Sequence, residues 1–226
     1  MRPAILFDLD GTLVDTIQLL LESMRHAFEG RDRAPTTAEW TAGIGTPLAT
    51  QFRSFADDEA DVQRLTERYR AYQRLHHDRL TKAFDGALLT IRELHRLGYP
   101  LGIVTSKAND IANRTLQHVD LAAYFGVVVG VESTLRHKPD PEPVQFALAH
   151  LHSASEGALF VGDSPHDIAA GNAAGVITVA ALWGAFAPEV LRAARPHHEL
   201  ERIAALPDLI RRQQSPIAAS ERSREG

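Results

Sequence analysis

Two aspartates separated by one residue, Asp8 and Asp10, follow a short apolar run at residues 4–7. The run has the composition of a buried strand, and Gly11 and Thr12 behind the acids predict a sharp turn where it ends. Because side chains at positions i and i+2 of a strand lie on one face, both carboxylates should point into one crevice. Two like charges so close are costly unless a cation lies between them or one is protonated. The pair therefore predicts a divalent metal, a shared proton, or both.

Paired carboxylates of this kind fit one particular chemistry. Mg²⁺ prefers oxygen ligands, and a carboxylate beside a second acid suits covalent phosphoryl transfer, in which one aspartate attacks and the other carries a proton. The simpler alternative is a strand end with a polar turn, because Asp-Gly is common in turns. That alternative explains Asp8 alone better than it explains two acids in front of Gly-Thr.

Hydroxyl groups and a lysine follow two other apolar runs. The predicted strand at 101–105 ends in Thr105, with Ser106 behind it, and hydroxyls there can hold a phosphate oxygen. Alone this signal is weak, since Thr-Ser before a helix is commonly an N-cap. Lys138 follows the predicted strand at 127–131 and could neutralise phosphate as a point charge. A single lysine in a loop is more often a surface residue.

A second pair of acids follows the apolar run at 158–161. Asp163 and Asp167 come after Gly162, which lets the backbone turn, and they add hard oxygen ligands. Each acid alone could be a helix N-cap. Because the carboxyl ends of parallel strands open on one rim, these acids should converge with Asp8. Together the groups supply the nucleophile, proton donor, metal ligands and positive charge that phosphoryl transfer needs.

Strands and short helices alternate from residue 87 onward, which predicts βαβ units and a parallel sheet. Right-handed crossovers make such a sheet doubly wound, so the expected class is α/β. The expected strands are 4–7, 101–105, 127–131, 158–161 and 176–182, and the expected helices are 87–97, 110–119, 141–151, 167–174, 188–194 and 207–212.

Residues 15–81 have a different pattern, with no run rich in β-formers. Apolar residues recur at helical spacing over 17–28, and 57–80 is a long polar stretch whose Arg and Glu residues indicate a solvated helix face. We therefore expect an all-helical insert, with a loop at 43–48 between helices. The predicted domains are a core of 1–14 and 82–213, a helical cap of 15–81, and a flexible tail of 214–226.

The chain of 226 residues is long enough for one good core and a small second unit. Its net charge of −5 and the lack of a basic block argue against nucleic acid or a membrane surface as a partner. Without cysteine, disulfides and thiolate chemistry are excluded. No apolar run reaches the ~18 residues of a membrane span. The first strand begins too early for a signal peptide, so the cytoplasm is the expected location.

Two stretches resemble motifs of the haloacid dehalogenase superfamily, and within it the phosphatase branch with a helical cap. They are DLDGTLVDT at 8–16 and GDSPHDIAAGNAAG at 162–175, and the resemblance extends over residues 4–183. It implies a Rossmann-like core, Mg²⁺ as cofactor, and a loop at 43–48 that faces the site and helps to select the substrate.

The resemblance also implies a role for each polar group. Asp8 matches the nucleophile that forms an aspartyl-phosphate, and Asp10 matches the general acid/base, whose main-chain carbonyl binds Mg²⁺. Lys138 matches the catalytic lysine that holds the nucleophile and the phosphate. The implied phosphate-binding set is Gly11, Thr105, Ser106 and Lys138, and the implied metal-binding set is Asp8, Asp10, Asp163 and Asp167.

Asp10 also bears on the type of reaction. In dehalogenases and phosphonate-cleaving members the matching position is not an aspartate, so the resemblance implies hydrolysis of a phosphate ester. TSK at 105–107 and GTPL at 45–48 look most like phosphoglycolate phosphatases. The expected partner is a small phosphorylated metabolite, and the expected assembly is a monomer or homodimer. The alternatives are an inorganic pyrophosphatase, a sugar-phosphate mutase similar to β-phosphoglucomutase, and a non-catalytic binding module.

Two adjacent pairs among the 11 histidines also need an interpretation. His76-His77 and His197-His198 have no carboxylate or cysteine partners at metal-ligand spacing. We therefore expect solvated surface residues at both places.

Overall fold

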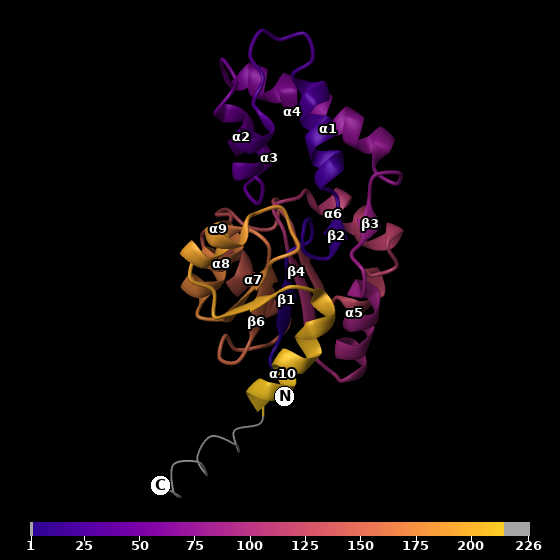
Figure 1. Ribbon diagram of the computed structural model, residues 1–226, viewed down its shortest axis with the longest axis vertical. Helices are drawn as coiled ribbons and strands as arrows, with labels where there is room; N and C mark the ends of the chain where they lie inside the picture. The colour runs from indigo at the N-terminus through magenta and orange to yellow at the C-terminus, as the bar shows by residue number, and fades with distance from the viewer. Residues whose placement is uncertain (1, 215–226) are drawn as a thin grey trace, which may run out of the picture.

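The computed structural model describes residues 2–214, and its core is a six-stranded sheet (Figure 1). The order across the sheet is β5-β4-β1-β6-β7-β8, and every neighbouring pair is parallel. The strands are β1 Ile5–Phe7, β4 Leu101–Val104, β5 Val127–Val129, β6 Leu159–Gly162, β7 Ile177–Ala181 and β8 His198–Leu200. The predicted α/β class with a parallel sheet is confirmed. Of the predicted tail of 214–226, residue 214 ends a helix, and residues 215–226 lie outside the described residues.

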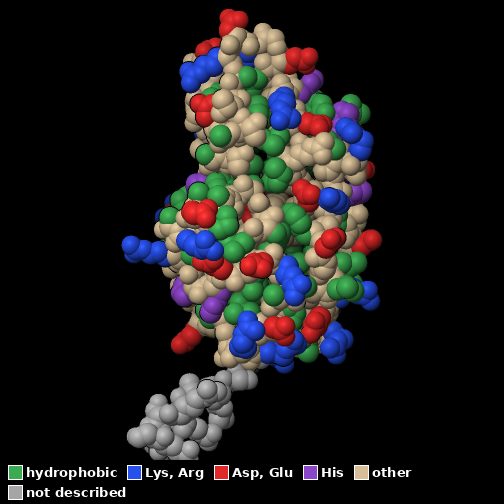
Figure 2. Space-filling model, in the orientation of Figure 1, with side chains coloured by type: hydrophobic (Ala, Val, Ile, Leu, Met, Phe, Trp, Pro, Cys, Tyr) green, Lys and Arg blue, Asp and Glu red, His purple; other side chains and the backbone are tan. Residues whose placement is uncertain are grey.

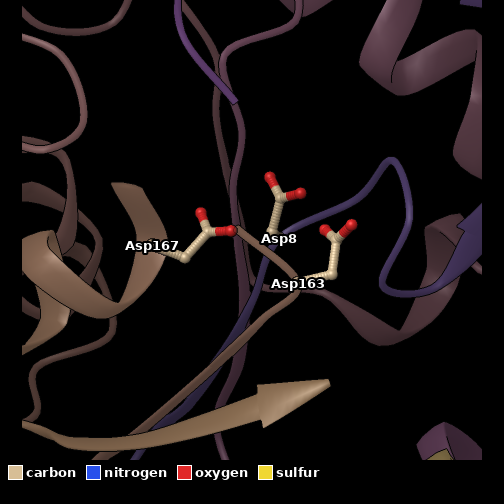
Figure 3. Close-up of side chains that lie close together, drawn as sticks. All are labelled: Asp8, Asp163 and Asp167. Atoms are coloured by element: carbon tan, nitrogen blue, oxygen red, sulfur yellow. The ribbon is translucent and has the colours of Figure 1, made fainter. Parts of the chain in front are cut away.

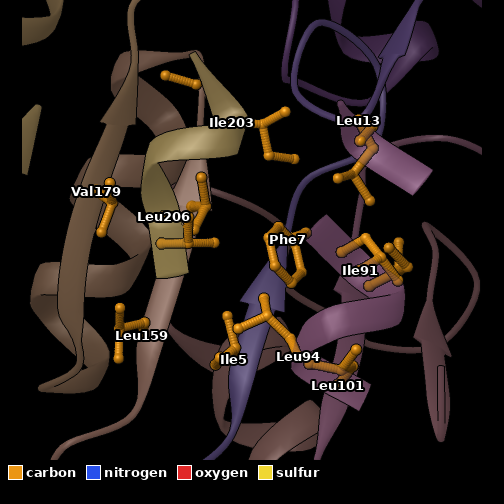
Figure 4. Close-up of a cluster of buried hydrophobic side chains, with 14 of the residues drawn as sticks. Ile5, Phe7, Leu13, Ile91, Leu94, Leu101, Leu159, Val179, Ile203 and Leu206 are labelled. Atoms are coloured by element: carbon orange, nitrogen blue, oxygen red, sulfur yellow. The ribbon is translucent and has the colours of Figure 1, made fainter. Parts of the chain in front are cut away.

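Helices cover both faces of this sheet because its strands are apolar on both sides. Ile5 and Phe7 point to one face and pack with α5, α6 and α10, whereas Leu6 points to the other face and packs with α7 and α8. Figure 4 shows the first of these clusters, with Ile91 and Leu206 beside β1. The helices are α5 Ala87–Arg96, α6 Asn109–His118, α7 Glu142–His150, α8 Pro165–Ala174, α9 Pro188–Ala193 and α10 Leu206–Gln214, with short 3-10 turns at η1 Ala122–Tyr124 and η2 Ile203–Ala205.

Between β1 and β4 the chain leaves the sheet and forms a helical region, which Figure 1 places at one end of the molecule. Its helices are α1 Ile17–Ala27, α2 Thr37–Ala42, α3 Leu48–Arg53 and α4 Glu59–His76. They enclose an aromatic cluster of their own, in which the ring centroids of Trp40 and Phe52 are 5.1 Å apart and Phe28 and Tyr69 pack nearby. The predicted helical insert is confirmed, and its division from the core as a separate domain stays a prediction.

Short elements account for the differences from the sequence prediction. The chain enters and leaves the helical region through an antiparallel pair, β2 Val14–Asp15 and β3 Lys82–Ala83, which is too short to produce a pattern. The strand β8 was not predicted, because its three residues include His198 and Glu199 and are mostly polar. Helix α3 was not predicted either, because Pro47 in front of it favours an interpretation of this stretch as a loop.

His77 was predicted to lie on the surface, and this prediction is wrong. The residue is buried at the end of the helical region, with Nδ1 2.7 Å from a carboxylate oxygen of Asp78 and Nε2 2.8 Å from the hydroxyl of Thr115. Thr115 belongs to α6, so the imidazole joins the end of the helical region to a helix of the core. Sequence spacing could not indicate this contact because its two sides are 38 residues apart.

Figure 2 shows acidic and basic side chains interspersed over the visible face of the molecule. Within residues 2–214 no helix combines the length and the apolar character that crossing a membrane would require.

One buried carboxylate in the helical region is held by several donors. Asp61 is 2% exposed and lies 2.7 Å from a guanidinium nitrogen of Arg31. It also accepts a hydrogen bond from the backbone N–H of Asp57 at 3.1 Å. The hydrogen bond from Arg31 is the main reason why the pKa of Asp61 is lowered to about 2.

Replacing Asp61 with Asn should therefore lower the free energy of unfolding by about 1–2 kcal/mol near neutral pH. The native pKa lies below the unfolded value of about 4, so this stabilisation is complete above about pH 4 and is lost as the pH falls towards about 2. Urea unfolding of both proteins over a range of pH measures the difference. Asp57→Asn is the matched control, because Asp57 contacts the same arginine but is 87% exposed. A difference that does not change with pH would contradict the prediction.

Candidate active site

Three adjacent strands place their polar groups at one edge of the sheet. Asp8 directly follows β1, Thr105 follows β4 and Asp163 follows β6, with β1 between the other two. The backbone N–H of Asp8 still donates to the carbonyl of Val161 at 2.9 Å, so the sheet itself fixes where this side chain begins. The structure thus brings together the groups that the sequence assigned to separate strand ends.

Asp8, Asp163 and Asp167 form a cluster of three buried carboxylates (Figure 3). One oxygen from each acid lies within 4.8 Å of the others, and each residue is at most 4% exposed. Figure 3 shows that Asp163 follows the end of β6 while Asp167 comes from the first turn of α8. Hard carboxylate oxygens gathered in this way can hold a metal ion.

Lys138 supplies the positive charge next to this cluster. Its ammonium is buried and lies 2.7 Å from Oδ1 of Asp8 and 2.6 Å from Oδ1 of Asp167. It also donates to the carbonyl of Val104 at 3.2 Å. Burial alone would lower the pKa of Lys138, but the charges of Asp167 and Asp8 outweigh it and raise that pKa. The alternative of a surface lysine is therefore excluded.

One ammonium does not balance three buried carboxylates. Burial raises the pKa of Asp8 to about 7, although Lys138 acts in the opposite direction. Burial also raises the pKa of Asp163 well above its ordinary value, and the charges of Asp8 and Asp167 add to that effect. Both pKa shifts show that the single ammonium does not offset the burial and mutual repulsion of these carboxylates. A divalent cation bound to these oxygens would supply further positive charge, so the donor set and its charge both fit a metal.

The backbone around Asp163 leaves no room for side chains. Gly11 has φ +81°, and a Cβ atom there would lie 2.2 Å from Oδ2 of Asp163. A Cβ atom at Gly184 would lie 2.2 Å from the Cβ of the same aspartate. The hydroxyl of Thr12 donates to Oδ1 at 3.2 Å, and the N–H of Ala185 donates to Oδ2 at 2.9 Å. Two glycines and two donors therefore fix this carboxylate in place.

Asp167 has two tasks in the structure. Its Oδ2 accepts hydrogen bonds from the N–H and the hydroxyl of Ser164, at 3.0 and 2.6 Å, which completes a capping box at the start of α8. Its Oδ1 faces Lys138 in the cluster. Asp167 is therefore the third helical residue of the capping box and not the N-cap itself, which is Ser164, and its role as a metal ligand stays a prediction. Helix α8 begins at Pro165, two residues before the predicted start, because Ser164 is its N-cap.

Asp10 lies apart from the three-carboxylate cluster. Its Oδ1 accepts from the hydroxyl of Thr16 at 2.6 Å and from the ammonium of Lys107 at 2.5 Å. Sequence reasoning assigned no role to Lys107, although it directly follows the Thr-Ser pair at the end of β4. Its position at a strand end was the one available signal. The role of Asp10 as a metal ligand stays a prediction.

The two hydroxyl residues after β4 differ in their contacts. Ser106 donates its hydroxyl hydrogen to the carbonyl of Gly45, at 2.5 Å, and so ties the core to the predicted loop at 43–48. The hydroxyl oxygen of Thr105 accepts from the N–H of Lys107 at 3.3 Å, and its hydrogen has no acceptor within residues 2–214. Thr105 can therefore donate to a bound anion, whereas the hydroxyl hydrogen of Ser106 is already in use.

A pocket of about 210 Å³ opens between the sheet edge and the helical region. On the core side it is lined by Asp8, Asp10, Thr105, Lys107 and Asp163. On the other side it is lined by the loop at 43–48 and by residues of α3 and α4, so the loop lies at the site. The pocket is large enough for a small phosphorylated molecule whose phosphoryl group reaches Asp8.

Comparison with known proteins covers almost the whole chain. The family model for haloacid dehalogenase-like hydrolases matches residues 5–181. The chain is 37% identical over 203 residues to a pyrophosphatase PpaX of Anoxybacillus flavithermus, covering 89% of this chain and 94% of that protein. It is 36% identical over 209 residues to a pyrophosphatase PpaX of Listeria monocytogenes, covering 92% and 95%.

Solved structures share the fold at lower sequence identity. A predicted phosphoglycolate phosphatase from Haemophilus somnus superposes with a TM-score of 0.82 at 21% identity, covering 92% of this chain and 97% of that one. A hydrolase from Pseudomonas syringae gives 0.84 at 22% identity, covering 93% and 99%.

Removing the buried ammonium should destabilise the fold, since it would leave the carboxylate cluster uncompensated. Lys138→Met should cost about 3–5 kcal/mol of unfolding free energy in metal-free protein. Lys82→Met is the matched control, because Lys82 is 77% exposed, pairs with Asp15 at 3.4 Å and should cost at most about 1 kcal/mol. Urea unfolding measures both values. Equal costs for the two variants would show that Lys138 does not hold the cluster together.

Proposed function

The chain belongs to the haloacid dehalogenase-like hydrolases, and from this premise we propose that it hydrolyses inorganic pyrophosphate with Mg²⁺ as its cofactor. The observation that carries the choice of substrate is the likeness to relatives named pyrophosphatase, at 36% and 37% identity over most of both chains. Phosphoglycolate, the substrate class that the sequence favoured, is supported by likenesses below 25% identity, which bear on the fold alone. Pyrophosphate therefore replaces it as the first candidate.

Asp8 is the proposed nucleophile. Its Oδ1 accepts from Lys138, and its Oδ2 has no donor among residues 2–214, so Oδ2 is free to attack phosphorus. Attack forms a bond between Oδ2 and phosphorus and breaks the bond from that phosphorus to the bridging oxygen. The second phosphate leaves with the electron pair, and an aspartyl-phosphate remains.

Asp10 is the proposed proton carrier. Thr16 and Lys107 both donate to its Oδ1, which leaves Oδ2 free to exchange a proton. A proton on Oδ2 passes to the leaving phosphate, and the resulting carboxylate then takes a proton from water. The hydroxide formed attacks phosphorus, and the bond from phosphorus to Asp8 breaks. Orthophosphate is released, and the free carboxylate of Asp8 is regenerated.

The remaining polar groups would stabilise the negative charge of the phosphate oxygens and hold the nucleophile in position. Asp8, Asp163 and Asp167 would hold Mg²⁺, and bound Mg²⁺ offsets negative charge on the phosphate oxygens. Lys138 holds Asp8 in position, and the free hydroxyl hydrogen of Thr105 can donate to the transferred phosphoryl group. Residues of the helical region line the side of the pocket opposite the carboxylates.

Phosphate release from a panel of substrates tests this proposal. With Mg²⁺, pyrophosphate should have the highest kcat/KM, about tenfold or more above phosphoglycolate, sugar phosphates and nucleotides, and EDTA should abolish release. A clear preference for phosphoglycolate would replace the proposed substrate. Formation of an isomerised sugar phosphate would support the mutase, and no release from any compound would support the binding module.

Asp8→Asn should lower turnover of the best substrate by about a thousandfold or more, because the amide oxygen is a poor nucleophile. The circular dichroism spectrum should match that of the wild type. Asp208→Asn on α10 is the control, since that carboxylate is on the surface away from the pocket and its loss should leave kcat unchanged. Substantial activity in the Asp8 variant would rule out a covalent intermediate on this residue.

A further inference from the structure

One face of α4 carries polar side chains into the pocket opposite the carboxylates. Thr66, Arg70 and Gln73 all line the pocket, and their spacing of four and three residues puts them on one side of the helix. Figure 1 shows α4 within the helical region, apart from the strands β1 and β4. The pocket therefore has two polar walls, one from the core and one from α4.

The polar groups of this second wall lack protein partners. The hydroxyl oxygen of Thr66 is buried and has no hydrogen-bond partner within residues 2–214. Gln73 is only 7% exposed, yet its amide has no hydrogen bond in the described part of the chain. Buried polar groups in proteins almost always have partners. A buried hydroxyl without a partner and a nearly buried amide without a hydrogen bond, both lining one pocket, indicate that a ligand satisfies them.

Arg70 indicates that this ligand carries a negative charge. Two cationic side chains line the pocket, and Lys107 is already paired with Asp10. The guanidinium of Arg70 has no carboxylate partner among the described residues, whereas Arg64 on the same helix is paired with Asp61. An unpaired guanidinium beside amide and hydroxyl groups fits a phosphate or carboxylate group, which it can bind with two hydrogen bonds.

We infer that Arg70, with Gln73 and Thr66, forms a subsite for a second anionic group of the substrate, at the end remote from the transferred phosphoryl group. The inference rests on the proposed function and extends it, since the phosphoryl group attacked by Asp8 occupies the core wall. The substrate class is thus a phosphate compound with two anionic ends. Pyrophosphate has a second phosphate there, and phosphoglycolate has a carboxylate.

Binding of two small phosphorus anions tests the subsite without turnover. Methylenediphosphonate, which has two phosphonate groups and resists hydrolysis, is compared with orthophosphate by calorimetric titration of the Mg²⁺-loaded protein. The wild type should bind methylenediphosphonate about tenfold to a hundredfold more tightly than orthophosphate. Arg70→Ala should remove this advantage while leaving the Kd of orthophosphate within about twofold, and Arg70→Lys should keep part of it.

Arg74→Ala is the matched control, because Arg74 is exposed on the same helix, one turn further on, and does not line the pocket. Its ratio of the two Kd values should equal that of the wild type. An unchanged ratio in the Arg70→Ala variant, an equal loss in both arginine variants, or equal wild-type affinities for the two probes would overturn the inference.

Kinetics separate this inference from the proposed function. If the wild type cleaves pyrophosphate, Arg70→Ala should raise its KM about tenfold or more and change kcat much less. If phosphoglycolate is cleaved instead, the proposed function fails, and the subsite stands only when the same variant raises the KM for phosphoglycolate. A KM unchanged by Arg70→Ala for whichever substrate is cleaved would overturn the subsite.

Discussion

The site depends on one electrostatic constraint, which is that three carboxylates are kept close together and away from water. Separating a buried charge from solvent costs several kcal/mol unless a partner compensates it. The ammonium of Lys138 compensates part of that cost for Asp8 and Asp167, and the remaining deficit of positive charge fits the metal ion that we propose for this cluster. Positive charge beside these carboxylates therefore serves two purposes. It stabilises the buried acids, and in the proposed reaction it offsets the negative charge of the phosphate.

The sheet and the helical region contribute different things to the pocket. The ends of β1, β4 and β6 are fixed by backbone hydrogen bonds between fully buried strands, and the core wall of the pocket is built on these ends. The helical region has its own aromatic cluster around Trp40, which lets α4 present side chains from a stable helix rather than from a loop. The hydrogen bonds from Ser106 to Gly45 and between His77 and Thr115 join the two parts.

Much of the core could be predicted from the sequence because its signals are local. An apolar run followed directly by acids marks a strand end, and this placed Asp8 and Asp163 correctly at one edge of the sheet. Lys138 lies in a loop, and only the resemblance to a family distinguished it from a surface lysine. The pairing of Lys107 with Asp10 joins residues 97 apart, and no periodicity reports such a contact. Strand β8 and the burial of His77 depend in the same way on neighbours that are distant in the sequence.

Selection of the substrate has to come from outside the core wall. In the proposed reaction Asp8, Thr105 and Lys138 all act on the phosphoryl group that is transferred, and this group is the same in pyrophosphate and in phosphoglycolate. The core residues can therefore accelerate phosphoryl transfer, but they cannot make the enzyme prefer one of these two substrates. Discrimination needs a group that reaches the other end of the substrate, and α4 carries the unpaired guanidinium on that side of the pocket. For the same reason, a shared fold at 21–22% identity gives little information on the substrate, because it does not fix which side chains α4 carries.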